Sequence, residues 1–240
     1  MAFIHKFVNA PQLTSTTRED GHRTYLTPEG FSYPSVTTIL GELPNKGLDN
    51  WRKRVGEKEA ARISKAATTR GSNLHLVVED YLWNRPLEFG NPFTKNLFNK
   101  IKTTLDNINN IRLIEKPLYS NRLKMAGTPD CIAEYGGKLS VIDFKTSTTI
   151  KEEKWIGSYY CQTGAYTVMY DELFGEKPEQ GVIIIAVEEA NIPQVFIKDS
   201  KECFYMLREH AEKVIDHRTG GKSDDKDRNS THVASGIRIG

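Results

Sequence analysis

Short apolar segments, separated by glycine, proline or charged residues, recur along the second half of the chain and predict a β-sheet. Residues 182–187 are apolar without interruption, as expected for a strand that is buried on both faces of a sheet. Gly136-Gly137 indicates a tight turn between two neighbouring strands. The predicted strands are residues 111–119 (with Glu115 at the centre), 122–135, 138–146, 182–187 and 195–197.

Helices are predicted where apolar residues recur every three or four positions. Ser35 is placed to cap a short helix, and Gly175 to end a long one. Gly71-Ser72-Asn73 is expected to interrupt another helix. The segment 92–110 carries an apolar stripe that we expect to lie in the core. Its members are Phe93, Leu97, Ile101, Leu105 and Ile108. The predicted helices span residues 36–40, 48–69, 75–82, 92–110, 152–174 and 200–217.

This order of elements predicts an α/β (α+β) fold in which helices flank a mixed central sheet. Before the helices, a Pro28-Glu29-Gly30 turn within residues 22–36 predicts a hairpin. We expect three parts along the chain. They are residues 1–110 (a hairpin and helical region), 111–218 (the main core) and 219–240 (a polar, flexible tail).

Composition narrows the class of protein without identifying it. Of the 240 residues, 38% are hydrophobic and 27% are charged, which suits a globular core and excludes a fully disordered chain. No apolar stretch approaches the roughly 18 residues of a membrane helix, and no targeting signal is seen at the N-terminus, so we expect a cytoplasmic protein. The scattered Cys131, Cys161 and Cys203 argue against a zinc site and exclude a four-cysteine iron–sulfur cluster.

Positive charge is concentrated in one predicted helix, although the whole chain carries a formal net charge of only +2. Seven basic residues lie between positions 51 and 70, against the two acids Glu57 and Glu59, which leaves a local balance of +5. This run is either an ordinary solvated helix face or a surface for nucleic-acid phosphates, which attract clustered Lys and Arg through counterion release. The seven basic residues are Arg52, Lys53, Arg54, Lys58, Arg62, Lys65 and Arg70, and Trp51 at the start of the run adds an aromatic ring for stacking on bases.

A cluster of charged residues is predicted within residues 127–145. Asp143 and Lys145 are two positions apart on one strand, so both side chains project from the same face. Asp130 can approach them from the neighbouring strand. Charged groups at the end of an apolar strand are costly to bury unless they are paired, and oxygen-rich clusters suit Mg²⁺ or Mn²⁺. Taken alone, Asp143-Phe144-Lys145 is equally consistent with a surface ion pair.

The order of the polar residues, rather than any single motif, carries a resemblance to a known family. With Pro129-Asp130 followed by Asp143-Phe144-Lys145, the chain resembles the PD-(D/E)xK nucleases. Gly71 and His75, four residues apart before the sheet, resemble an element of the RecB-like branch of that superfamily. So do Gln162 and Tyr166 on the helix after the core strands.

Two further segments make the resemblance narrower. Residues 33–40 and 127–130 resemble the mitochondrial genome maintenance exonucleases and their phage relatives. The likeness covers about residues 30–175 and implies a restriction-endonuclease-like core. The iron–sulfur members of the branch are excluded, because they need four cysteines.

The resemblance also implies roles for individual residues. The metal ligands would be His75, Glu115, Asp130, Asp143 and the backbone carbonyl of Phe144, with Mg²⁺ as the metal and Mn²⁺ as a substitute. Lys145 would orient or activate the attacking water and stabilise negative charge. Because carboxylates lie close by, we expect it to act as an ammonium rather than as a free base. Gln162 and Tyr166 would hold Lys145 or a substrate phosphate.

The resemblance further implies a DNA exonuclease that prefers single strands or free ends. The basic residues between Trp51 and Arg70 would guide the strand. A sequence- or structure-specific endonuclease of the same superfamily is a second interpretation. A nuclease-fold protein that binds DNA without cutting it is a third, and the intact set of Asp130, Asp143 and Lys145 argues against it. The expected setting is a bacterial or phage-infected cytoplasm.

Overall fold

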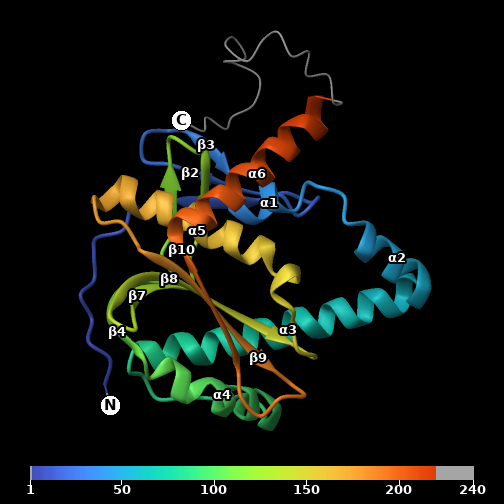
Figure 1. Cartoon of the computed structure of the whole chain (residues 1–240), viewed down its shortest axis with the longest axis vertical. Helices are drawn as coiled ribbons and strands as arrows, with labels where there is room; N and C mark the ends of the chain where they lie inside the picture. The colour runs from blue at the N-terminus through green and yellow to red at the C-terminus, as the bar shows by residue number, and fades with distance from the viewer. Residues whose placement is uncertain (1, 220–240) are drawn as a thin grey trace.

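The centre of the fold is a five-stranded mixed sheet (Figure 1) in a computed structural model that describes residues 2–219. Its strand order is β10-β9-β8-β7-β4. β8 and β9 are parallel, and the chain between them crosses over through α5, whereas the other neighbours are antiparallel. The strands are β4 (Ile108–Ile114), β7 (Cys131–Tyr135), β8 (Lys138–Ser147), β9 (Gln180–Val187) and β10 (Gln194–Asp199).

Helices cover both faces of this sheet (Figure 1). α3 (Glu57–Leu82) and α4 (Pro92–Leu105) pack against one face, and α5 (Gly157–Phe174) and α6 (Ser200–Thr219) pack against the other. The predicted class, a mixed α/β fold with helices flanking a central sheet, is confirmed.

β8 shows how the sequence divides the core between these two faces. Val141 contributes to the apolar cluster beneath α5, whereas Ile142 and Phe144 contribute to the cluster beneath α3 and α4. The reason is that successive side chains of a strand point to opposite faces. Asp143 follows the same alternation, so it projects to the α5 face, with a relative exposure of only 3%. The fully buried strand predicted at residues 182–187 is confirmed as part of β9.

The break predicted at Gly71-Ser72-Asn73 is wrong, because α3 runs through it without interruption. The break lies earlier, at Gly56, where a φ of 85° separates α2 (Lys46–Val55) from α3. A glycine inside a helix costs about 1 kcal/mol relative to alanine. Burial of Leu74, Val77 and Leu82 on the following turns offsets that cost.

The helix predicted at residues 92–110 ends at Leu105, and Ile108 begins β4 instead. Phe93 is not a core residue, since it lies in the first turn of α4 and is 46% exposed. Glu115 is not at the centre of a strand. It follows the end of β4 with a φ of 48°, and the chain then forms a separate hairpin of β5 (Leu118–Ser120) and β6 (Met125–Gly127).

The N-terminal region forms its own small sheet beside the core. It contains the predicted hairpin, β2 (Arg23–Leu26) and β3 (Ser32–Pro34), and an additional strand, β1 (Thr14–Thr17). The helix cap predicted at Ser35 is confirmed, because its hydroxyl accepts a hydrogen bond from the Thr38 amide at 3.0 Å at the start of α1 (Val36–Leu40).

The helix predicted from residue 152 begins as a single 3₁₀ turn (Glu153–Trp155) before α5. As predicted, α5 ends at Gly175, which has a left-handed φ of 67°. The predicted tail at 219–240 lies outside the described residues except for Thr219, the last residue of α6. Between residues 2 and 219, no helix has both the length and the apolar content that a membrane span needs.

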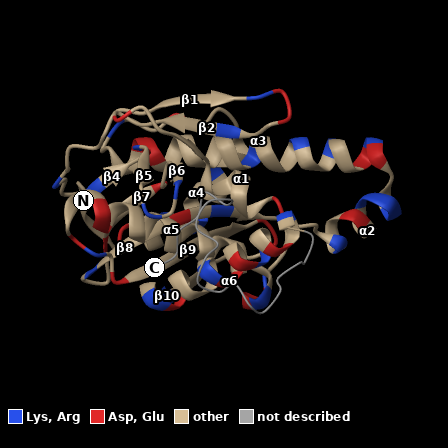
Figure 2. Ribbon diagram, turned by 90° about the horizontal axis from the view of Figure 1, so that it is seen from above, with Lys and Arg blue, Asp and Glu red and all other residues tan. Residues whose placement is uncertain are grey.

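α2 and the first half of α3 project from the body of the molecule as an arm, residues 46–69 (Figure 1). No residue of α2 is buried, and Ala60 is the one buried residue in the arm's part of α3. Figure 2 shows Lys and Arg, in blue, spaced along it. The arm joins the body where Arg70 forms an ion pair with Glu188, just beyond β9.

Candidate active site

Asp143 and Lys145 are adjacent on the same face of β8. The Lys145 Nζ lies 2.5 Å from Asp143 Oδ1 and 3.5 Å from the Gln162 Oε1 on α5. It also lies 5.0 Å from the centre of the Tyr159 ring. Lys145 is therefore held by one strand and one helix, with its ammonium group pointed at a carboxylate.

Asp130 precedes β7 and is tied to the same part of β8. Its Oδ2 accepts a hydrogen bond from the backbone amide of Phe144 at 2.7 Å, and its own carbonyl accepts one from the Glu115 amide at 3.1 Å. These backbone contacts place Glu115 and Asp130 next to each other. The left-handed backbone at Glu115 separates it from the regular part of β4.

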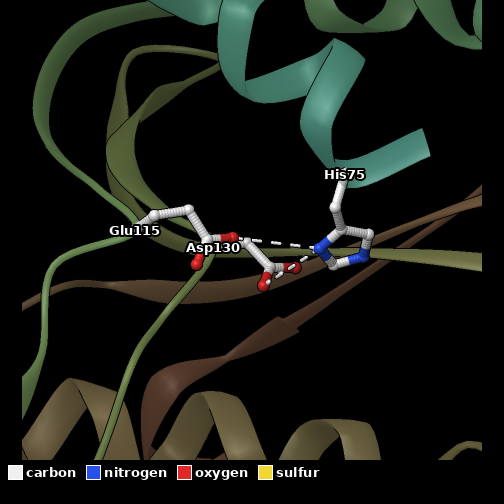
Figure 3. A group of neighbouring side chains, drawn as sticks. All are labelled: His75, Glu115 and Asp130. Carbon is white, nitrogen blue, oxygen red and sulfur yellow. Dashed lines mark ion pairs between the residues drawn. The ribbon is translucent and has the colours of Figure 1, made fainter. Parts of the chain in front are cut away.

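His75 brings α3 to the same place from the other side (Figure 3). Its Nδ1 lies 3.6 Å from Asp130 Oδ1 and 3.9 Å from Glu115 Oε1, and its Nε2 lies 2.7 Å from the Phe144 carbonyl oxygen. The continuous α3 carries His75 to this position. Residues from four separate elements of the chain thus converge around Phe144.

The set of donor atoms fits a divalent cation. One ligand atom from each of His75, Glu115 and Asp130 lies within 4.8 Å of the others. Asp143 adds a further observation, because its Oδ2 is buried and has no hydrogen-bond partner among the described residues. A buried carboxylate oxygen without a partner is costly, and a cation bound there would satisfy it.

Gln162 and Tyr166 lie one turn apart on α5, as the spacing predicts. Gln162 faces Lys145, whereas Tyr166 is buried beneath it with 4% relative exposure. Gly127, on β6, leaves the space that the Tyr166 ring occupies. A Cβ added to Gly127 would meet the Tyr166 hydroxyl at 2.8 Å.

Comparison with known proteins agrees with this geometry. Residues 45–232 match the sequence profile of the PD-(D/E)XK nuclease superfamily. The chain belongs to that superfamily. Within the matched range, Pro129-Asp130 and Asp143-Phe144-Lys145 correspond letter for letter to the pattern in the superfamily's name.

Individual relatives add detail to this assignment. The chain is 29% identical over 187 residues to "Mitochondrial genome maintenance exonuclease 1" of Mus musculus, an alignment that covers 72% of this chain and 55% of the relative. The protein of the same name from Xenopus tropicalis is 26% identical over 189 residues, covering 72% of this chain and 53% of the relative. The chain thus spans about half the length of these curated relatives. Among solved structures, "Crystal structure of SSO0001" aligns with 74% of this chain and 84% of that one at 15% identity and a TM-score of 0.37.

Burial dominates the electrostatics of the carboxylates in this candidate site. It raises the pKa of Asp143 to about 6, against the opposing charge of Lys145. Burial also raises the pKa of Asp130, although His75 and Lys145 oppose the shift. A divalent cation would favour the ionised forms of both groups.

For the two cationic side chains, burial acts on the pKa in the opposite direction, but neighbouring negative charge outweighs it. Burial alone would lower the pKa of His75, but the charge of Asp130 and the nearby Glu115 carboxylate outweigh it and raise the pKa to about 9. Burial would likewise lower the pKa of Lys145, and the charges of Asp143 and Asp130 raise it instead. Lys145 is therefore an ammonium at neutral pH, in keeping with an electrostatic role.

Two contacts at this nuclease site were outside the sequence prediction. Tyr159 faces Lys145 from the first turn of α5, and its spacing of three residues before Gln162 was the available signal. Tyr25, in the N-terminal sheet, lies with its hydroxyl 3.4 Å from the Thr128 hydroxyl, two residues before Asp130. No spacing signal connects β2 with that loop, because the contact bridges more than a hundred residues.

The predicted DNA-binding residues fall into two groups. Those on the arm are exposed, apart from the half-buried Trp51. Arg62 is paired with Glu59 at 2.7 Å. Arg70 is half-buried, pairs with Glu188 and donates to the Thr146 hydroxyl at 3.2 Å, so its guanidinium is engaged within the protein.

Proposed function

We propose that this member of the PD-(D/E)XK superfamily is a metal-dependent exonuclease that hydrolyses DNA. The observation that carries the proposal is the convergence of Asp130, Asp143 and Lys145 with His75 and Glu115, together with the unpartnered oxygen of Asp143. The relatives named as exonucleases support the reaction class.

His75, Glu115, Asp130 and Asp143 would hold the metal, with the Phe144 carbonyl as a further oxygen donor. Carboxylate and carbonyl oxygens suit Mg²⁺, and Mn²⁺ also accepts an imidazole ligand. Bound Mg²⁺ would neutralise charge at the scissile phosphate and lower the pKa of a bound water.

The side chains of the protein supply orientation and charge. Lys145 presents an ammonium group beside the carboxylates, where it can donate hydrogen bonds to the attacking water and to a phosphate oxygen. Because it is already oriented by Asp143 and Gln162, it stabilises developing negative charge with little reorganisation. Tyr166 supports the turn of α5 that carries Gln162, and the Tyr159 ring lies beside the Lys145 ammonium group.

We further propose that the substrate is single-stranded DNA or DNA with a free end. The net charge of +2 does not supply a broadly basic surface for a duplex. The basic residues instead follow one projecting arm (Figure 2). A narrow line of cations with aromatic side chains nearby suits the backbone of one strand.

A digestion experiment tests this proposal. Linear single-stranded DNA labelled at one end, and a circular strand of the same sequence, are incubated with the protein in Mg²⁺, in Mn²⁺ and with a chelator. We expect rapid degradation of the linear strand with either metal, a resistant circle, and no cleavage with the chelator. Cleavage of the circle at the same rate would reject the exonuclease and favour an endonuclease.

Two variants test the site itself. Asp143→Asn removes one proposed ligand charge, and Lys145→Ala removes the ammonium group. Both are expected to abolish cleavage while strand binding, measured with the chelator present, is largely retained. Wild-type cleavage by either variant would refute the assignment of the site.

A further inference from the structure

A second hollow lies on a different face of α3 from the one that lines the active site. It has a volume of about 560 Å³ and lies between α3 and the first turn of α4. The α3 residues that line it recur every three or four positions from Arg62 to Asn73, whereas those that line the active-site pocket run from Gly71 to Glu79. At 3.6 residues per turn, these two faces are about 120° apart. We call the second hollow the α3–α4 groove.

The groove carries an excess of positive charge. Arg62, Lys65 and Arg70 line it, against one carboxylate, Glu188, so its formal balance is +2. Glu188 is neutralised by its ion pair with Arg70. Lys65 is exposed and has no ion-pair partner among residues 2–219. α4 also begins here, and the start of a helix carries a partial positive charge.

Phe93 gives the groove an aromatic surface. Its side chain lines the groove, is 46% exposed and belongs to none of the buried clusters. The apolar stripe of α4 begins to pack against the core only at Leu97, one turn later. An exposed aromatic ring beside an unpaired lysine and further basic side chains is the combination on which single-stranded nucleic acid stacks its bases and places its phosphates.

The groove lies close to the proposed catalytic residues. Arg70 connects the two sites, because it bonds both to Thr146, the neighbour of Lys145, and to Glu188 in the groove. Lys145 pairs with Ile185 across the β8–β9 ladder. Glu188 is three residues further along, about 10 Å at a rise of about 3.3 Å per residue.

We infer that the α3–α4 groove binds a single-stranded segment of the substrate a few nucleotides away from the scissile bond. Phe93 stacks on a base, and Lys65 and Arg62 contact phosphates. The inference rests on the proposed function, since it concerns the same strand that the active site cuts. It adds a second binding region on a face of α3 that the active site does not use.

The test compares binding of short and long strands, about 4 and about 16 nucleotides, which are the limits of typical single-strand sites. Fluorescent oligothymidylates are titrated with a chelator present, so that the result does not depend on cleavage. The variants are Phe93→Ala, Phe93→Trp as a conservative replacement, and Tyr205→Ala as a control. Tyr205 is a 59% exposed aromatic residue on α6, outside both sites.

In the wild type we expect the long strand to bind more tightly than the short one. Phe93→Ala should reduce that advantage at least about fivefold, the lower end of the effect of one stacked base, and Phe93→Trp should restore it. Lys65→Ala should lower the slope of log affinity against log salt by about one. Tyr205→Ala should leave the advantage intact.

Two outcomes would overturn the inference. They are an unchanged length advantage in Phe93→Ala, whether or not both strands bind more weakly, or the same loss of the advantage in Tyr205→Ala. A protein ligand in the groove, rather than DNA, would give the first outcome. Because Phe93 is exposed, circular dichroism and urea unfolding of Phe93→Ala should match the wild type, which separates lost binding from lost folding. Absence of wild-type cleavage would reject the proposed function without deciding these binding results.

Discussion

Replacing Asp143 by asparagine should make the metal-free protein more stable, even though it removes a proposed metal ligand. Asp143 is 3% exposed, one of its carboxylate oxygens lacks a partner, and burial raises its pKa from 3.8 to about 6. A shift of about two pKa units corresponds to about 3 kcal/mol against the ionised folded protein. The attraction of Lys145 is already included in that pKa, so about 3 kcal/mol is an upper limit for the gain.

The pH dependence follows from the sign of the shift. Because the pKa in the folded protein lies above the usual value, the unfolded chain releases the proton first as the pH rises. The wild type therefore loses stability relative to Asp143→Asn between about pH 4 and pH 6, and the difference is constant above that range. Below pH 4 both proteins carry a neutral side chain, and their stabilities should converge.

Urea unfolding in the presence of a chelator measures this difference. The control is Asp216→Asn, which makes the same change of charge at an exposed position of α6 and should have little effect. Adding Mg²⁺ at a thousand times its dissociation constant should reverse the order, because it stabilises the wild type by about 4.1 kcal/mol, more than the upper limit of about 3 kcal/mol for the gain. An Asp143→Asn protein less stable than the wild type at pH 7 without metal would refute the reasoning.

Two further predictions concern packing around the site. Gly127→Ala should destabilise the fold by about 1–3 kcal/mol through overpacking against Tyr166. Tyr166→Phe should relieve only part of this loss, since a ring carbon of Tyr166 also lies 2.9 Å from the added Cβ. Full additivity of the two changes in a double-mutant cycle would contradict the contact. Arg70→Met should lower the free energy of unfolding in urea by about 1–3 kcal/mol, because it leaves the carboxylate of Glu188 without its cationic partner. Adding Glu188→Leu should recover part of that loss, and no recovery would show that the ion pair is not the cause.

Periodic burial is the part of this fold that the sequence predicts well. The unbroken run in β9 and the alternation in β8 depend on which face of the strand each residue occupies. The alternation within β8 therefore places Asp143 and Lys145 on one face without knowledge of distant contacts. The helix ends at Ser35 and Gly175 were predicted equally well, since helix ends depend on local hydrogen bonds.

Glycine positions in the helices show where local signals fail. Gly56 and Gly71 have the same intrinsic preference, yet only Gly56 breaks the chain into two helices. The difference lies in the packing of the neighbouring turns. The turns after Gly71 bury Leu74 and Val77 against the sheet, and that tertiary packing outweighs the propensity of a single residue.

The sequence indicated which residues come together in the site, but not how they contact one another. The positions of His75 and Glu115 in the chain indicated that they belong with Asp130, as their ligand atoms do in the structure. The Phe144 carbonyl contacts His75 and the Phe144 amide contacts Asp130 because both groups of one strand residue point to the same side of β8, beyond the first residue of β7. Such contacts join residues tens of positions apart and leave no periodic trace in the sequence.

Phe93 shows both what a periodic pattern predicts and what depends on tertiary packing. Its spacing from Leu97 and Ile101 gives it the same periodic signature as a core residue, and periodicity alone cannot tell how far a sheet extends beneath a helix. α4 begins one turn before the packed part of its stripe, so Phe93 is left in solvent beside Lys65. A single half-exposed apolar residue is ordinary at a protein surface, so it is the cations lining the same groove that mark Phe93 as part of a binding surface. If the protein cuts DNA as proposed, the occupant that the unpaired Lys65 favours is the strand being cut.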